Sequence, residues 1–209
     1  ETDDERLSYS VGYQMAQNIE KGLKQTNNQL EFDALVEGLR AGVAGSSAMM
    51  TEEEMNGLVQ AQTRGRREYS NVERDREAQE IKSRGVAYLE ENREKEGVVV
   101  LPSGVQYRVI KLGDGRKPSA DESVVAHYEG RFIDGKVFDS SHERNEPLTF
   151  SVTGVIKGWQ EVLQLMPVGS KWEVAIPSDL AYGSRGRPGI PPNATLIFDI
   201  ELIDIRPGG

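Results

Sequence analysis

Aromatic and apolar residues that could line a pocket for a proline ring are concentrated between residues 123 and 198. They lie in five short stretches, at residues 124–130, 137–141, 154–159, 181–183 and 189–198. No nucleophile, metal-ligand cluster or phosphate loop accompanies them. Rotation about an X-Pro bond costs about 18–20 kcal/mol because amide resonance is lost, yet no covalent bond breaks. A dry apolar pocket should favour the twisted amide over the planar, strongly hydrated one, so the chemistry indicated is the binding and twisting of a peptide.

Other chemistries find little support in the sequence. The two histidines, His127 and His142, have no cysteine in the chain to join them, so we expect no zinc site or other metal site. Residues 183–186 have the sequence Gly-Ser-Arg-Gly and lack the Lys-Ser/Thr that follows in a phosphate loop. We therefore expect no cofactor.

In order and spacing, the five stretches resemble the FKBP family of peptidyl-prolyl cis-trans isomerases over roughly residues 97–205. The resemblance is specific because several separate blocks recur in one order. It implies a pocket with Trp159 as its floor, and hydrogen bonds to substrate carbonyls from the Ile156 amide and the Tyr182 hydroxyl. The catalytic residues that it implies are Tyr128, Phe138, Asp139, Ile156, Trp159, Tyr182 and Phe198.

The resemblance also implies substrate-binding residues around that pocket, which are Arg144, Leu148, Phe150, Val155, Arg187 and Ile190. Asp139 is expected to accept a hydrogen bond from Arg144. Leu148 stands where the family often has an aromatic residue, and Arg187 stands where it often has histidine. The loop with Ile190 is one residue shorter than in some relatives. These departures bear on substrate preference and on binding of the macrolides tacrolimus and rapamycin, which the resemblance implies as inhibitors.

After Gly97 the apolar residues follow the two-residue period of strands. The alternation is clearest over residues 172–176 and 196–202. Asp134-Gly135 predicts a two-residue hairpin turn, because both residue types accept positive φ. One helix interrupts the strands, at residues 157–166, and ends before a proline. An antiparallel sheet wrapped on one short helix is an α+β domain, which agrees with the fold that the resemblance implies.

Two short amphipathic helices are predicted in the amino-terminal part of the chain. Apolar residues recur at intervals of four from Leu7 to Leu23, and Gly22 or the Asn27-Asn28 pair should end that helix. Residues 32–43 carry a second apolar face, which should stop near residues 42–47 at glycines and serines.

A third, long helix is predicted to begin at Thr51, which can form a capping box with Glu54. The sequence then runs to Glu96 without a proline, and apolar residues become sparse beyond Arg64. Charges of both signs are interleaved there, so pairs at helical spacing can support an exposed helix. We interpret residues 51–96 as a solvated stalk. A disordered charged linker and a coiled coil are the alternatives, and no sustained heptad favours the coiled coil.

The two short helices cannot bury their apolar faces alone. We expect them to pack in a symmetric pair of chains, with packing inside one chain as the alternative. Residues 1–50 would then be a helical dimerisation module, residues 51–96 a stalk and residues 97–209 the isomerase domain. This organisation resembles the macrophage infectivity potentiator group of FKBPs, which are V-shaped homodimers.

The 209 residues carry a net charge of −9, of which −7 falls within residues 1–97. No basic footprint for nucleic acid is present, and no apolar run approaches the roughly 20 residues that span a bilayer. Because the chain starts at Glu1, we expect upstream residues to have been removed, either a secretory signal or residues trimmed from the natural chain. We expect a periplasmic or outer-membrane-associated location in a bacterium, with the cytoplasm as the alternative.

Three functions compete at this point. The leading one is an isomerase that acts on X-Pro bonds of unfolded or flexible proline-containing polypeptides. The alternative is a homodimeric chaperone that holds unfolded clients in the cleft between subunits, with isomerase activity secondary. A structural or adhesion protein with an idle pocket is the third, and the retained pocket residues argue against it.

Overall fold

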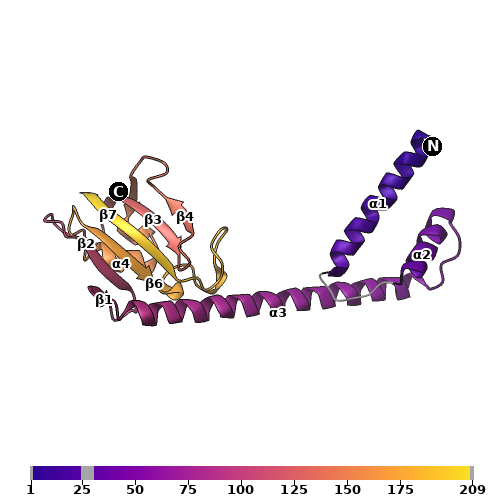
Figure 1. Cartoon of the computed structure of the whole chain (residues 1–209), viewed down its shortest axis with the longest axis horizontal. Helices are drawn as coiled ribbons and strands as arrows, with labels where there is room; N and C mark the ends of the chain where they lie inside the picture. The colour runs from indigo at the N-terminus through magenta and orange to yellow at the C-terminus, as the bar shows by residue number, and fades with distance from the viewer. Residues whose placement is uncertain (1, 25–30, 208–209) are drawn as a thin grey trace. The chain divides into compact units, whose positions relative to one another are not determined.

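The computed structural model describes residues 2–24 and 31–207, and side chains at residues 22–24 are not described (Figure 1). The chain divides into two compact units, Glu1–Asp75 and Arg76–Gly209. Helix α3 (Glu52–Asn92) is one continuous helix that contributes to both units. The predicted long helix is therefore confirmed.

The first unit contains α1 (Asp3–Lys24), α2 (Phe32–Ala44) and the start of α3. Gly45 ends α2 in the left-handed conformation, with φ of 66°. The Ser46 amide donates to the Ala41 carbonyl at 3.0 Å, which satisfies a carbonyl of the last turn. The predicted stop of this helix is confirmed. The stop predicted at Asn27-Asn28 lies outside the described residues.

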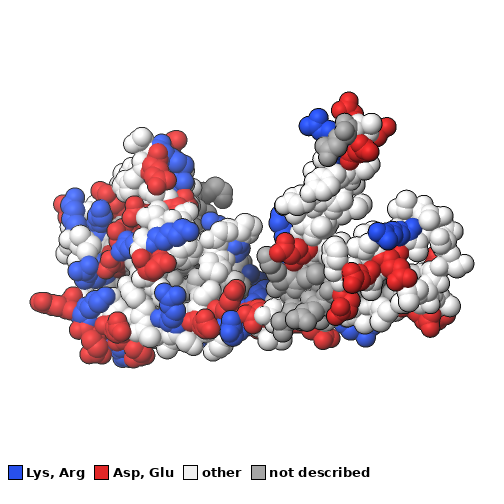
Figure 2. All heavy atoms as spheres, turned by 45° about the vertical axis from the view of Figure 1, so that its right-hand side comes forward, with Lys and Arg blue, Asp and Glu red and all other residues white. Residues whose placement is uncertain are grey.

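The apolar faces of α1 and α2 stay exposed within a single chain. Leu7 is 64% exposed, Met15 53% and Phe32 70%, and the described part of α2 contains no buried residue. In Figure 2 the visible side of α1 is mostly uncharged between its charged ends. Such faces are expected to pack against another surface.

A capping box begins α3, as the sequence predicts. The Thr51 amide donates to Glu54 Oε2 at 2.8 Å, and the Glu54 amide donates to Thr51 Oγ1 at 3.2 Å. The carboxylate also lies at the positive end of the helix dipole, and its pKa is lowered by the hydrogen bond from the Thr51 backbone.

The last turns of α3 pack on the sheet of the second unit, which differs from the expectation of a solvated helix. Gly85 and Asn92 are buried. Asn92 Nδ2 donates to Gln106 Oε1 at 2.9 Å, and Gln106 Nε2 donates to the Leu89 carbonyl at 2.8 Å. Asn193 Nδ2 donates to the Ala78 carbonyl at 3.2 Å. Ile81 also packs against the core, but the other contacts are made by polar groups and a glycine, so the sparse apolar residues of this segment did not reveal the docking.

The second unit is built on a seven-stranded antiparallel sheet in the order β1-β2-β6-β7-β3-β4, with β5 paired to β3. The strands are β1 (Val98–Val100), β2 (Gln106–Lys111), β3 (Ser123–Phe132), β4 (Val137–Ser140), β5 (Leu148–Ser151), β6 (Lys171–Ile176) and β7 (Leu196–Arg206). Short 3₁₀ helices lie at η1 (Val152–Gly154), η2 (Ser178–Leu180) and η3 (Gly183–Arg185).

Helix α4 (Lys157–Leu163) lies against this sheet and completes the core (Figure 1). Val162 and Leu163 are fully buried, as are Leu196, Ile200 and Leu202 of β7. The predicted α+β fold is confirmed. Helix α4 ends at Leu163, three residues before the predicted end at Met166. Met166 is fully buried, but it lies in the turn that follows the helix, so its burial did not mark the helix end.

The β3–β4 hairpin differs from the predicted two-residue turn. The Phe132 amide donates to the Lys136 carbonyl and the Gly135 amide to the Phe132 carbonyl, both at 2.9 Å, so three residues form the loop. Gly135 has φ of 87°, whereas Asp134 is not among the described residues with positive φ. This is the three-residue loop with a left-handed glycine at its end. Asp134 instead accepts the Lys136 amide at 3.0 Å.

Two glycines of α3 give a matched test of its docking. In Gly65→Ala the new Cβ meets nothing within 4 Å, so we expect stabilisation by about 0.5–1 kcal/mol from helix propensity. In Gly85→Ala the same gain is outweighed, because the Cβ collides with Thr195 Oγ1 and lies 3.1 Å from Thr195 Cβ. Chemical unfolding followed by circular dichroism should show opposite signs, and equal stabilisation of both variants would contradict the docked end of α3.

Candidate active site

A cavity of about 350 Å³ opens between α4, β3, β4, β5 and the loops before β7. Eleven residues line it, and most are aromatic or aliphatic: Tyr128, Phe138, Asp139, Phe150, Gly154, Val155, Ile156, Trp159, Tyr182, Arg187 and Phe198. All seven residues named as catalytic candidates are among them. The sheet and one helix thus bring together side chains that are up to 70 residues apart in the sequence.

Trp159 stands at the centre of the aromatic lining. Its ring lies 5.4 Å from that of Tyr128, 5.5 Å from Phe150 and 5.3 Å from Phe198, with interplanar angles of 73° to 87°. The Phe138 ring meets Phe198 edge to face at 5.8 Å. Edge-to-face pairs stabilise one another beyond their buried area, so the cavity wall is held in one arrangement without a ligand.

A backbone amide and a hydroxyl at the cavity have no hydrogen-bond partner within the described chain, and the buried Trp159 indole nitrogen has none either. Ile156 precedes α4 as its N-cap, and its carbonyl accepts the Trp159 amide at 2.9 Å while its own amide donates to no described group. The Tyr182 hydroxyl also has no hydrogen-bond partner there, although the Arg187 guanidinium lies 4.8 Å from the centre of the Tyr182 ring. Backbone and hydroxyl donors beside an apolar cavity can bind the carbonyls of a peptide.

Asp139 forms a closed three-residue cluster with Tyr128 and Arg144. The Tyr128 hydroxyl donates to Asp139 Oδ2 at 2.6 Å, and Arg144 Nη1 donates to Asp139 Oδ1 at 2.7 Å. Arg144 Nη2 donates to the Tyr128 hydroxyl oxygen at 2.9 Å. Charge-assisted bonds of this kind are the stronger ones, and they fix the tyrosine ring on one side of the cavity.

The protonation of this cluster follows from its contacts. Partial burial by itself would raise the pKa of Asp139, but the hydrogen bonds from Tyr128 and Arg144 outweigh it and hold the pKa below its ordinary value. Burial raises the pKa of Tyr128, and its hydrogen bond to Asp139 raises it further. At neutral pH the carboxylate is therefore charged and the phenol neutral.

The substrate-binding candidates are distributed less uniformly. Phe150, Val155 and Arg187 line the cavity, and Leu148 is half-buried in β5 against the core. Arg144 contacts the cavity through Asp139 and Tyr128 and does not line it. Ile190 is only 3% exposed and packs in the core. Its amide and carbonyl pair with those of Arg187 across a tight turn, which holds that loop beside the cavity.

Two glycines belong to the site, although the sequence analysis gave them no role. Gly154 lines the cavity. A Cβ at Gly130 in β3 would lie 2.6 Å from Phe138 Cζ and 2.8 Å from Phe198 Cε1, so the two rings occupy the space that a side chain would take. The available signal was a glycine inside a strand pattern, which often marks a close approach.

No group of three or more His, Asp or Glu side chains that could hold a metal ion occurs among the residues described. His127 and His142 stack on each other at 4.6 Å, and His127 Nδ1 lies 2.9 Å from Ser141 Oγ. The arrangement supports binding and distortion of a peptide by apolar walls and hydrogen bonds.

Comparison with known families agrees with this chemistry. Residues 114–203 match the family model described as FKBP-type peptidyl-prolyl cis-trans isomerase, and residues 4–109 match the domain amino terminal to such isomerases. The chain belongs to the FKBP-type peptidyl-prolyl cis-trans isomerases. The predicted isomerase function is therefore confirmed. The comparisons do not favour the chaperone alternative.

Relatives of this FKBP-type isomerase match it over its whole length. An FKBP-type 22 kDa peptidyl-prolyl cis-trans isomerase of Escherichia coli is 44% identical, covering 98% of this chain and 97% of the relative. The outer membrane protein MIP of Legionella longbeachae is 43% identical, covering 98% and 87%. The crystal structure of FkpA from Escherichia coli matches with a TM-score of 0.85 at 35% identity, covering 100% and 99%.

Proposed function

We propose that the cavity around Trp159 binds the proline ring of an X-Pro segment and favours its twisted amide. The observation that carries this proposal is an apolar, aromatic cavity that presents a backbone amide and a hydroxyl, neither of which has a partner among the described residues. Trp159 forms the floor, and the walls are formed by Tyr128, Phe138, Val155, Ile156 and Phe198. Because the twisted amide has lost conjugation and much of its dipole, a dry apolar site stabilises it relative to the hydrated planar form.

The Ile156 amide and the Tyr182 hydroxyl would hold the carbonyls that flank the proline. Fixing both sides of the rotating bond limits its motion to the productive torsion, which is an orientation effect. Asp139 keeps Tyr128 in place and adds negative charge to one side of the cavity. All these interactions are non-covalent, and none requires proton transfer.

Tyr182→Phe tests the proposed carbonyl contact by removing one oxygen atom. We expect kcat/KM for a short X-Pro peptide to fall by about three- to tenfold, the equivalent of one hydrogen bond. Thermal unfolding should not change, because the hydroxyl has no partner within the described chain. Activity equal to wild type would remove Tyr182 from the mechanism, and a lowered melting temperature would give it a structural role.

We also propose that the chain is a homodimer formed through its amino-terminal helices. The exposed apolar residues of α1 and α2 supply the surface. Residues 1–50 would form the dimerisation module, residues 51–96 the connecting helix and residues 97–209 the isomerase domain. These proposed boundaries differ from the boundary between the two compact units, which falls inside α3, because the end of α3 packs within the second unit.

Leu39→Glu should convert the dimer to a monomer, because it places a charge on the apolar face of α2, where Leu39 is 50% exposed in the single chain. Sedimentation should then give 23.2 kDa in place of twice that mass. Val72→Glu adds the same charge at a 64%-exposed position of α3 and should leave the mass unchanged. Wild-type chain that sediments as a monomer would contradict the proposal.

The cell envelope is the proposed location, either the periplasm or the outer membrane, with the cytoplasm as the alternative. A relative that is 43% identical is described as an outer membrane protein. No described helix has the length and apolar character needed to cross a bilayer. Fractionation of the source bacterium would contradict this location if the protein were recovered in the cytoplasm.

Tacrolimus and rapamycin are the proposed inhibitors, competing with the X-Pro peptide for the Trp159 cavity. The apolar lining supports this, and Leu148 and Arg187 are the positions expected to set their affinity. Inhibition that does not compete with the peptide would contradict binding in this cavity.

A further inference from the structure

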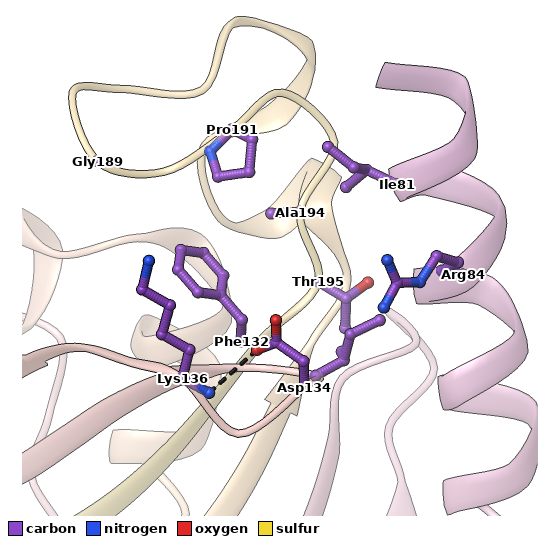
Figure 3. Close-up of a pocket in the computed structure, with 10 residues that line it drawn as sticks. Ile81, Arg84, Phe132, Asp134, Lys136, Gly189, Pro191, Ala194 and Thr195 are labelled. Atoms are coloured by element: carbon purple, nitrogen blue, oxygen red, sulfur yellow. Dashed lines mark hydrogen bonds between the residues drawn. The ribbon is translucent and has the colours of Figure 1, made fainter. Parts of the chain in front are cut away.

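A second cavity of about 350 Å³ lies in the same unit and shares no lining residue with the isomerase cavity. Three segments enclose it: the end of α3, the β3–β4 hairpin and the loop that leads into β7 (Figure 3). We call it the second cavity. It exists only because α3 packs on the sheet, so it is a product of the docking described above.

The interior of the second cavity is apolar. Ile81 from α3 and Phe132 from β3 are half-buried, and Ala194 is 6% exposed. Figure 3 shows the Pro191 ring facing the same space as Phe132 and Ile81. An opening of this size and lining suits an aliphatic or aromatic side chain.

The rim of the second cavity carries an excess of positive charge. Arg84 comes from α3 and Lys136 from the hairpin, and neither side chain forms an ion pair or hydrogen bond in the part of the chain that the structure describes. The one carboxylate in the lining, Asp134, already accepts the Lys136 backbone amide at 3.0 Å. Two cations that have no partner among the described residues therefore stand at an apolar opening in a chain of net charge −9.

The two cavities are neighbours, because the same hairpin and the same loop contribute residues to both. The Phe132 ring lies 5.0 Å from the Phe138 ring, and these rings line the second cavity and the isomerase cavity respectively. The turn at residues 187–190 also serves both, because Arg187 lines the isomerase cavity and Gly189 the second one. A polypeptide bound in the isomerase cavity can reach the second cavity within a few residues.

We propose that the second cavity binds a segment of the same client polypeptide, through an apolar side chain next to an Asp or Glu. The apolar side chain enters between Ile81, Phe132 and Pro191, and the carboxylate pairs with Arg84 and Lys136. This proposal rests on the isomerase cavity taking the proline of that client. Its consequence is a preference for clients with an acidic-apolar pair a few residues from the proline.

The test compares the full chain with the double variant Arg84→Glu/Lys136→Glu on two substrates. One is a short X-Pro tetrapeptide. The other is a set of longer peptides in which a Glu-Leu pair lies about four or eight residues before or after the proline. An extended peptide spans about 3.3 Å per residue, so these spacings sample different distances from the isomerase cavity. For wild type, one spacing should give a KM about fivefold below that of the tetrapeptide. The double variant should lose this advantage and keep the tetrapeptide rate. Added salt should also weaken the advantage.

Lys82→Glu is the control, because it reverses one charge, as each substitution of the double variant does, at an exposed position two residues from Arg84 and outside the lining. It should retain the lowered KM. Equal KM values for the long peptide in wild type and the double variant would overturn the proposal. An equal loss on the tetrapeptide would also overturn it, by placing these charges in the isomerase site.

A proline-free peptide with the Glu-Leu pair separates this proposal from the isomerase account. Its binding should shift the backbone amide resonances of Ala194 and Thr195 in wild type and not in the double variant. Shifts confined to residues of the isomerase cavity would contradict a second site. Wild-type chain that binds this peptide but fails to isomerise the tetrapeptide would contradict the isomerase account alone.

Discussion

Asp139→Ala is expected to lower kcat/KM for a short X-Pro peptide by at least about tenfold while leaving the chain folded. The carboxylate receives the Tyr128 hydroxyl at 2.6 Å and Arg144 at 2.7 Å. Hydrogen bonds to charged groups contribute about 1.5–3 kcal/mol each, and 1.36 kcal/mol in the barrier is a tenfold change in rate. Without the carboxylate, the tyrosine ring loses its fixed position against Trp159 and the cavity loses its negative charge.

The control for this variant is Asp114→Ala, which removes an exposed aspartate that makes no interaction with another described residue. It should keep wild-type activity and stability. Arg144→Gln should have a smaller effect than Asp139→Ala, because Tyr128 can still donate to the carboxylate. Full activity in Asp139→Ala would show that the cluster does not shape the reaction.

The pH dependence follows from the same cluster. A carboxyl whose pKa is lower in the folded chain stabilises the fold above its unfolded pKa, near 3.9 for aspartate. This contribution is lost as the pH falls through the lower, folded pKa. Activity should therefore persist through the ordinary aspartate range and decline only at lower pH. In Arg144→Gln, the midpoint of the Asp139 carboxyl titration, followed by carbon NMR, should move to higher pH because one hydrogen bond that lowers the pKa is lost. An unchanged midpoint would contradict the role of Arg144.

Gly130→Ala is expected to reduce both stability and activity. The added Cβ would lie 2.6–2.8 Å from ring atoms of Phe138 and Phe198, and both rings line the cavity. Overpacking of this kind costs about 1–3 kcal/mol. Any relief must displace an aromatic ring into the space for the proline, so kcat/KM should fall more than stability alone would suggest.

Gly154→Ala serves as the control for Gly130→Ala. Its Cβ would meet Ser151 Cβ at 3.4 Å, an ordinary contact, and its φ is not in the left-handed region. Denaturant unfolding should separate the two variants by at least about 1 kcal/mol. Adding Phe138→Leu to Gly130→Ala should recover stability but not activity. Two variants of equal stability would mean that the rings can yield, contrary to the packing described here.

The sequence predicted the α+β fold because its signals are local. Alternation over residues 196–202 matches the burial of β7, and Thr51 with Glu54 forms the capping box that the residue types indicate. The site candidates came from the resemblance to FKBPs, since most folds would bury Trp159 and Phe198 in their cores. Periodicity alone could not have distinguished a floor from a core residue.

Features that depend on distant contacts could not be predicted in this way. Besides one apolar residue, Ile81, the docking of α3 depends on Gly85 and on hydrogen bonds from Asn92 and Asn193, which leave no mark on an apolar pattern. Gly130 shows its role only when β4 and β7 bring two rings beside it. Ile190 lies in the core because its loop makes a tight turn with Arg187. The number of residues in the loop did not predict that turn.

The two tryptophans allow the central claim to be tested in one experiment. Trp159 lines the proposed isomerase cavity, whereas Trp172 of β6 stacks on Tyr107 at 4.3 Å and does not line it. In a chain labelled at the indole nitrogens, titration with an X-Pro peptide that the protein isomerises should shift the Trp159 signal, with half-saturation matching the peptide's binding constant. The Trp172 signal should stay in place. Turnover of the peptide with a stationary Trp159 signal, or with a shift at Trp172 alone, would contradict the assignment of catalysis to this cavity.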